Sequence, residues 1–163
     1  FPSGILDKEK LRSYYMQRLV SFEGVKYFWG GESRRGIDCS GLPRRALQDA
    51  LLEYGVRHGN SQAVRSALEL WWFDASARAL SVGYRGYTTP LGLTGTIREM
   101  NFDSLNVGDL AVTTDGVHML VYVGEEKWIQ ADPGRKAVVT LHARTDRKAW
   151  FETPVTTHRW STL

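Results

Sequence analysis

One cysteine in this 163-residue sequence lies in a setting suited to nucleophilic chemistry. Cys39 is the single cysteine, so it cannot form an intramolecular disulfide or supply a zinc site that needs several thiolates. It lies in the run GIDCSGL (residues 36–42), at the expected start of a helix. The partial positive charge of a helix N-terminus favours the thiolate, which is the nucleophilic form. We therefore expect Cys39 to be a reactive thiol with a lowered pKa, rather than an inert buried residue.

A thiol nucleophile needs a base, and His118 is the best placed of the four histidines. It opens the most apolar strand-like run, directly after an Asp-Gly turn at residues 115–116. A polar histidine at the mouth of a buried strand is an unusual choice for packing alone. The others follow a helix end (His58), end a strand-like run (His142) or lie among polar residues near the C-terminus (His158). We expect His118 to be the general base.

The base in turn needs a group that accepts a hydrogen bond from its second ring nitrogen. Two antiparallel strands joined by a turn at Gly124 would bring Gln130 near His118. A glutamine oxygen holds the tautomer but adds no negative charge. Asp132, two residues later on the same strand face, is the charged alternative. Of the two, Gln130 is the preferred candidate.

These residues are carried by helices in the first half of the chain and strands in the second. Apolar spacing predicts helices from Asp7 to Phe22, from Leu42 to Tyr54 with Gly55 as C-terminal cap, from Gln62 to Trp71, and a short one starting at Asp74. Residues 82–106 contain many Gly, Thr and Pro residues and are expected to be rich in loops. Strands are predicted at 110–112, 118–123, 127–131 and 137–141, separated by turns. Helices followed by strands predict an α+β fold with an antiparallel sheet.

Composition is that of one ordinary globular domain covering residues 1–163. Hydrophobic residues make up 42% and charged residues 24% of the chain, which excludes collagen, a disordered tail and a coiled-coil rod. No window of 18 apolar residues is present, so no membrane-spanning helix is expected. The net charge of +3 is scattered rather than gathered in a basic stripe, which argues against a nucleic-acid partner. The sequence starts at Phe1, so any signal peptide is not visible.

The chain resembles the NlpC/P60 cysteine peptidases, which are papain-like cell-wall hydrolases. The resemblance covers roughly residues 15–140 and rests on YxWGG (27–31), GIDCSGL (36–42), GDL (108–110) and His118 at the head of an apolar strand. It implies a papain-like fold, in which a helix bearing the nucleophilic cysteine at its N-terminus packs on a short antiparallel sheet that bears the histidine. It also implies no metal and no cofactor.

The resemblance assigns a role to each matching residue. Cys39 matches the nucleophile, His118 the general base and Gln130 the third polar position. Tyr27 matches a tyrosine whose hydroxyl helps to hold the oxyanion. The substrate-binding candidates are Asp38 and Ser40, which match positions that contact the substrate peptide and its free amino end, together with Trp29, Arg34 and Arg35. The two arginines lie close before the cysteine, where they are candidates to receive substrate carboxylates; the alternative is that they are solvated loop charges.

The implied activity is a cysteine endopeptidase that cleaves peptidoglycan stem peptides through an acyl-enzyme, with the D-γ-glutamyl–diamino acid amide as the favoured bond. The alternatives are an N-acetylmuramoyl-L-alanine amidase, another cysteine-dependent amidase such as a delivered antibacterial toxin, and a catalytically inactive wall-binding module. Protein partners are not identified. The substrate implies an exported protein in the periplasm, cell envelope or medium.

Three features depart from the pattern expected of the family. Gln130 takes the third polar position, which is commonly a histidine, so the charge at that position is fixed. Cys39 and His118 are 79 residues apart, and the extra length, around residues 56–106, is expected to form a lid or rim over the groove. Pro43, Arg44 and Arg45 follow the cysteine motif where such proteins usually continue with apolar helix residues. Proline is tolerated in a first helical turn.

Overall fold

The computed structural model describes residues 4–163 and contains both helices and a sheet. The helices are α1 (Lys8–Ser21), α2 (Gly41–His58), α3 (Ser61–Trp72), α4 (Ala77–Ser81), the short 3-10 helix η1 (Tyr84–Gly86) and α5 (Ala149–Glu152). The strands are β1 (Glu32–Ser33), β2 (Gly36–Ile37), β3 (Thr88–Thr96), β4 (Leu110–Thr113), β5 (Met119–Gly124), β6 (Lys127–Asp132), β7 (Ala137–His142) and β8 (Pro154–Trp160). The expected α+β class is confirmed.

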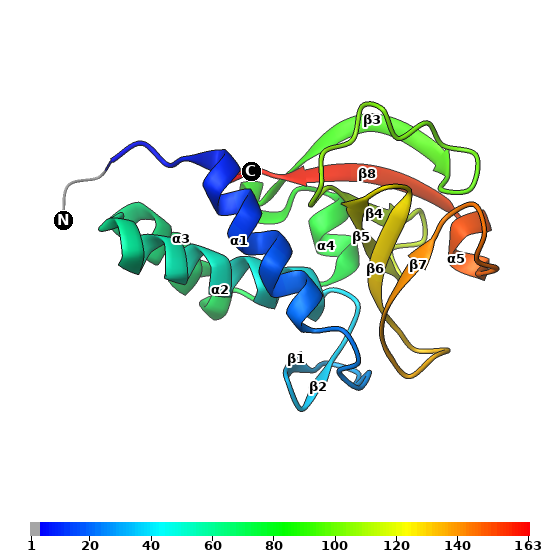
Figure 1. Ribbon diagram of the computed structural model, residues 1–163, viewed down its shortest axis with the longest axis horizontal. Helices are drawn as coiled ribbons and strands as arrows, with labels where there is room; N and C mark the ends of the chain where they lie inside the picture. Colours follow the sequence, from blue (N-terminus) through cyan, green and yellow to red (C-terminus); the bar gives the residue numbers. More distant parts are fainter. Residues whose placement is uncertain (1–3) are drawn as a thin grey trace.

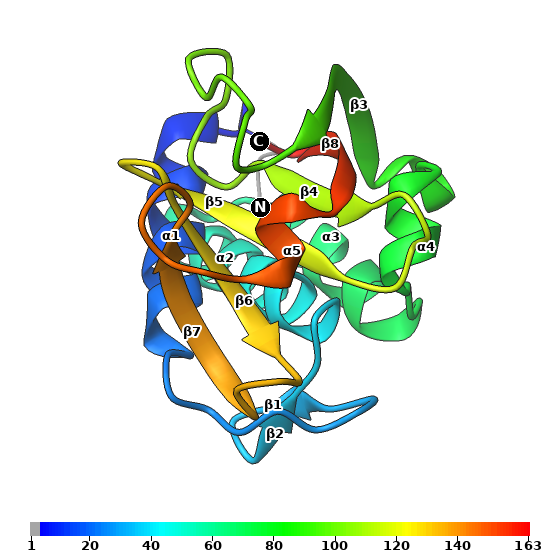
Figure 2. The same ribbon diagram turned by 90° about the vertical axis from the view of Figure 1, so that its right-hand side faces the viewer.

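Six of the strands form one antiparallel sheet in the order β3-β8-β4-β5-β6-β7, while β1 and β2 form a separate hairpin. Helices α1, α2 and α3 lie together on one side of the large sheet (Figure 1). The short helix α5 lies on the opposite side, in front of the central strands (Figure 2). The sheet is therefore covered on both faces.

The central strand β5 distributes its side chains between two hydrophobic cores. Met119 and Val121 pack with the buried residues of α1, α2 and α3. Leu120 and Tyr122 belong to the second core, together with Phe151 of α5. This alternation follows from the two-residue period of a strand.

Two of the predicted helices are confirmed at their expected positions. The side chain of Asp7 caps α1 by accepting a hydrogen bond from the Lys10 N–H at 3.1 Å. Helix α3 covers the predicted third helix. The fourth helix starts later than expected, at Ala77 rather than Asp74, because Ser76 supplies its N-cap by accepting from the Ala79 N–H at 3.1 Å.

Helix α2 is longer than predicted. It continues past Gly55 to His58 and ends at Gly59, which has a φ of 61° and takes the left-handed conformation of a C-terminal cap. Gly55 instead lies inside the helix, where a Cβ atom would come within 2.5 Å of the Val64 side chain. The glycine that was expected to end the helix therefore lets α3 approach it closely.

The prediction that residues 82–106 are mainly loop is wrong for the nine residues of β3. This strand lies at the edge of the sheet and pairs with β8, which was also not predicted. Proline is tolerated at an edge because it need not donate to a neighbour, and the register of β3 shifts between Pro90 and Thr94. The four predicted strands correspond to β4, β5, β6 and β7. In the part of the chain that the structure describes, no helix has the length and apolar character needed to cross a membrane.

Candidate active site

Cys39 lines a cavity of about 470 Å³ at the start of α2. Three parts of the chain meet there: the segment before α2, the segment from the end of α3 into the first turn of α4, and the turn before β5. The lining residues are Trp29, Gly30, Glu32, Asp38, Cys39, Ser40, Asp74, Ser76, Ala77, Arg78, Gly116 and Val117. The segment expected to form a rim, residues 56–106, supplies the wall made by 74–78.

Asp38 fixes the backbone on both sides of the cysteine. Its Oδ1 accepts a hydrogen bond from the Gly41 N–H at 2.7 Å, and its Oδ2 accepts one from the Gly30 N–H at 3.0 Å. The first bond satisfies a free donor at the start of α2, and the second ties the Gly30-Gly31 turn to it. Ser40 occupies the N-cap position, and its hydroxyl lies 3.4 Å from Asp38 Oδ1.

Gly41 allows the turn at residues 30–31 to pack directly on the start of α2. A Cβ atom at position 41 would lie 2.4 Å from the Gly31 carbonyl oxygen and 2.9 Å from Asp38 Oδ1. Any other residue would push the turn away from the helix. The glycines of the sequence motif therefore allow the backbone of the turn and that of the helix to come into close contact beside the thiol.

The thiol of Cys39 lies against the backbone on both sides of His118. Its Sγ donates a hydrogen bond to the Val117 carbonyl at 3.7 Å, and the Met119 N–H also lies toward the sulfur. Only 8% of the residue is exposed. Burial, and to a lesser extent the neighbouring Asp38 carboxylate, raise the pKa of Cys39 to about 11 against the opposing effect of nearby backbone N–H groups.

His118 is buried and held by two neighbours. Its Nε2 lies 2.7 Å from Gln130 Oε1, and its ring stacks on that of Trp150 with centroids 4.2 Å apart. Because a glutamine oxygen only accepts, Nε2 carries the proton and Nδ1 keeps its lone pair. Burial lowers the pKa of His118 to about 4, although the bond to Gln130 opposes this shift.

The structure brings Gln130, rather than Asp132, into contact with the imidazole. Asp132 Oδ2 lies 2.6 Å from Lys148 Nζ, and Asp132 Oδ1 accepts from the Gly134 N–H at 2.9 Å. Both side chains are fully buried on β6. Asp132 acts on His118 through its charge, which raises the pKa of the ring while Lys148 lowers it.

The expected low pKa of Cys39 is not what this structure gives. With the cysteine pKa near 11 and the histidine pKa near 4, both groups are neutral at pH 7. No hydrogen bond joins Sγ to the imidazole within residues 4–163. In this structure the two groups are a neutral thiol and a neutral imidazole.

This charge state predicts a pH profile for modification of Cys39. We expect its alkylation by iodoacetamide to be slow near pH 6 and to accelerate about tenfold per pH unit until the pH approaches the pKa of about 11, because the thiolate is the reacting form. Mass spectrometry measures the rate unambiguously, since the chain has one cysteine. N-acetylcysteine, treated in parallel, provides the control for the reagent. Fast alkylation near pH 6 with little pH dependence would contradict the neutral resting pair.

Tyr27 lies near the thiol, on the segment that pairs with Ile37. Burial raises the pKa of its phenol, and the charges of Cys39 and Asp38 act in the same direction. The Tyr27 N–H donates to the Lys136 carbonyl at 3.0 Å, so the backbone of this residue is tied to the β6–β7 turn. Trp29 lines the cavity with 80% of its surface exposed.

Arg34 and Arg35 do not line the Cys39 cavity. They form the turn of the β1–β2 hairpin, in which Ser33 pairs with Gly36. The Arg34 guanidinium donates to the Ser21 carbonyl and hydroxyl, both at 2.9 Å, at the end of α1. Their nearness to Cys39 in the sequence therefore does not carry them to the site.

Several residues that sequence reasoning missed help to build the site. Arg44 is 2% exposed and donates to the Leu70 carbonyl at 2.8 Å and to Asp74 Oδ1 at 2.7 Å. It also contacts Glu32 across the cavity wall. A charged residue where an apolar one was expected was the signal for this cluster. No local signal marks Trp150, since its contact with His118 depends on the path of the whole chain.

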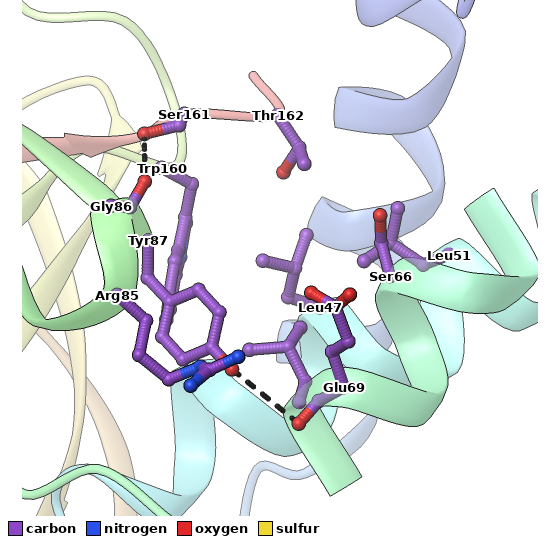
Figure 3. A pocket seen from close by; sticks show the side chains of 11 residues that line it. Leu47, Leu51, Ser66, Glu69, Arg85, Gly86, Tyr87, Trp160, Ser161 and Thr162 are labelled. Atoms are coloured by element: carbon purple, nitrogen blue, oxygen red, sulfur yellow. Dashed lines mark hydrogen bonds between the residues drawn. The ribbon is translucent and has the colours of Figure 1, made fainter. Parts of the chain in front are cut away.

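Figure 3 shows a smaller pocket of about 180 Å³ between α2, α3 and the segments 85–87 and 160–162. Its lining residues do not include Cys39, so the cavity that Cys39 lines is the candidate active site. Over the described range 4–163, no group of three or more His, Cys, Asp or Glu side chains is arranged to hold a metal ion.

Comparison with known proteins places these features in a family. The model of the NlpC/P60 family matches residues 24–158, which include the cysteine, the histidine and the glutamine. The chain belongs to the NlpC/P60 family. A comparison with curated proteins gave no match.

Solved NlpC/P60 structures share the fold. The peptidoglycan hydrolase RipB from Mycobacterium tuberculosis is 22% identical, with a TM-score of 0.56 over 94% of this chain and 67% of that one. NlpC1 from Trichomonas vaginalis is 18% identical, with a TM-score of 0.59 over 96% and 45% of the two chains. An NlpC/P60 family protein from Bacillus cereus is 16% identical, with a TM-score of 0.57 over 98% and 41%. The chain thus spans less than half the length of the last two.

Proposed function

We propose that this chain is a cysteine endopeptidase that cleaves peptidoglycan stem peptides at the D-γ-glutamyl–diamino acid amide. The observation that carries the proposal is the meeting of a cavity-lining thiol, Cys39, with the backbone around His118, whose Nε2 is held by Gln130. Membership of the NlpC/P60 family supports the substrate class, since the similar protein RipB is a peptidoglycan hydrolase. The chain acts as one catalytic domain in this proposal.

The proposed reaction begins with proton transfer from Sγ to Nδ1 of His118, the nitrogen left free by Gln130. The thiolate forms a bond to the amide carbon, and the carbonyl oxygen becomes an oxyanion. The Cys39 N–H and the Tyr27 hydroxyl donate hydrogen bonds to this oxygen, and such donors contribute about 3–4 kcal/mol each. Because the resting pair is neutral, the proton moves as the sulfur attacks.

The tetrahedral intermediate then collapses with loss of the amine. The carbon–nitrogen bond breaks, and Nδ1 of His118 returns its proton to the leaving nitrogen, which gives a thioester on Cys39. Water attacks the thioester with His118 again as the base, and the carbon–sulfur bond breaks to release the acid and the thiol. All the atoms and protons in this cycle come from the substrate, water and these two side chains.

The proposed substrate places the protein outside the cytoplasm, in the periplasm, the cell envelope or the medium. Stem peptides are then its partners in binding. This location follows from where the substrate occurs.

The test is a digest of purified peptidoglycan with products identified by mass spectrometry. We expect release of fragments cut between D-glutamate and the diamino acid, which leave a shortened stem on the sugar. Protein whose single cysteine has been alkylated is the matched control, and it should release none. Bare sugar chains would instead identify an amidase, and intact peptidoglycan bound by both proteins would identify a wall-binding module.

A further inference from the structure

Arg78 is the one cation among the twelve residues that line the Cys39 cavity in the described part of the chain. The three carboxylates that share the lining are already held by the protein. Asp38 accepts from two backbone N–H groups, while Glu32 and Asp74 contact the buried guanidinium of Arg44. Among the lining residues, Arg78 is therefore the one that can offer charged hydrogen-bond donors to a ligand.

The guanidinium of Arg78 keeps donors available beside the turn before β5. Its Nη2 donates to the Asp115 carbonyl at 2.7 Å. A guanidinium carries five N–H donors in a planar fork, which suits a carboxylate that accepts two parallel bonds. The remaining donors lie on an exposed residue that lines the cavity.

Gly116 fixes where the arginine lies. A Cβ atom there would come within 2.8 Å of Arg78 Cβ and 3.0 Å of its Nε, so the stem of Arg78 rests directly on the turn. The turn itself is held by Asp115, whose Oδ1 accepts from the Thr113 hydroxyl at 2.6 Å and the Val117 N–H at 3.0 Å. Val117 is the residue whose carbonyl accepts from the Cys39 thiol. Arg78 is thus held against the turn that contacts Cys39, in the cavity that both residues line, which reduces the entropy lost on binding.

We infer that Arg78 determines specificity by binding a free carboxylate next to the scissile amide of the substrate. This inference rests on the proposed function and assigns the carboxylate contact that Arg34 and Arg35 do not make in this fold. In a γ-linked glutamyl peptide, the α-carboxylate is the acidic group beside the amide. Peptides in which this carboxylate is a carboxamide lose the charge that Arg78 recognises.

The test compares hydrolysis of L-alanyl-γ-D-glutamyl-L-lysine with that of the same peptide bearing an α-carboxamide. We expect the unmodified protein to prefer the carboxylate peptide in kcat/KM by about 10- to 100-fold, the range for one charge-assisted contact. Arg78→Gln should remove this preference by raising KM for the carboxylate peptide alone, and Arg78→Lys should keep part of it. Arg65→Gln, which removes an exposed cation of α3 outside the cavity lining, is the matched control and should keep the full preference.

Two results would overturn the inference. One is an unmodified protein that treats both peptides alike. The other is an Arg78→Gln variant that loses the same factor on both peptides, since that points to damage to the turn rather than lost recognition. Calorimetric binding to Cys39→Ala protein separates the inference from the proposed reaction. If neither peptide is hydrolysed, tighter binding of the carboxylate form that depends on Arg78 would sustain the inference, and equal or absent binding would reject it.

Discussion

A Cys39→Ala variant is expected to fold normally and to lose hydrolysis of peptidoglycan by a factor of about 10⁴ or more. The sulfur of Cys39 is the atom that bonds to the substrate in the proposed reaction. The nearest side chains offer no replacement nucleophile of comparable strength. Ser40, its neighbour, directs its hydroxyl to an Asp38 carboxylate oxygen 3.4 Å away. The measurement is the initial rate of fragment release, followed by mass spectrometry.

Stability supplies the control for this variant. The thiol donates one long hydrogen bond, of 3.7 Å, to the Val117 carbonyl, so its loss is expected to change the free energy of unfolding by about 1 kcal/mol. Urea unfolding of the two proteins should therefore give similar midpoints. A Cys39→Ala protein that is stable and still cleaves at a rate near that of the parent would refute the assignment of the nucleophile.

A His118→Asn variant is expected to lower kcat by about 10³-fold, because general base and general acid steps each depend on this ring. Asparagine keeps a polar side chain beside Gln130 but has no atom that can accept and return the thiol proton at neutral pH. The KM for the peptide should change much less than kcat, since His118 is 1% exposed and lies below the cavity surface. A His118→Asn variant that retains most of its kcat would show that another group serves as the base.

The same substitution predicts a change in the pH dependence of stability. Burial holds the pKa of His118 at about 4 in the folded protein, against 6.5 for an ordinary histidine, so the unfolded chain binds this proton at higher pH. The neutral ring therefore contributes its full share to the free energy of unfolding above about pH 6.5. This contribution falls by about 3 kcal/mol as the pH drops to about 4. Urea unfolding measures the free energy of unfolding at pH 7 and pH 4. Its decrease between the two pH values should be about 3 kcal/mol smaller in His118→Asn than in the parent. Equal losses would mean that the ring is not buried in its neutral form.

The contact between His118 and Gln130 could be predicted because it depends on local pairing. A turn at Gly124 joins β5 to β6, and Val121 lies opposite Ile129. Continued along the strands, this register sets Gln130 opposite Leu120, so its side chain lies on the same face as His118, one pair away and within reach of the imidazole. The cysteine position was predictable for the same reason, since Asp38, Ser40 and Gly41 mark the start of α2 over four residues.

Long-range contacts could not be predicted from the sequence. Trp150 reaches His118 because α5 lies on the face of the sheet opposite α1, α2 and α3 (Figure 2). Arg78 reaches the cavity because α4 lies beside the turn at 115–117. Arg34 and Arg35 show the converse, since a tight hairpin turns them away from a cysteine only a few residues later.

The charge state of the thiol was mispredicted because two effects of different size compete. A helix N-terminus stabilises an anion by about 0.3–1 kcal/mol, which is less than one pKa unit. Full burial of an ionisable group shifts its pKa by up to about 3–5 units. The sequence indicates the helix but not the extent of burial. The larger effect therefore decides the outcome, and the pKa of Cys39 rises.

The place of β8 between β3 and β4 has a consequence for how the chain acquires its structure. The hairpins that join β4, β5, β6 and β7 can form as soon as their residues are synthesised, because each pairs with the strand next to it in sequence. β3 is made before all of them, yet its partner in the sheet, β8, is made last, at Pro154–Trp160. Closing that long loop is the entropically costly step. The nascent protein therefore carries a helical layer and four paired strands, with β3 still unpaired, until β8 emerges. A protease cut just before β8 would sever the strand that joins β3 to β4 from the rest of the chain.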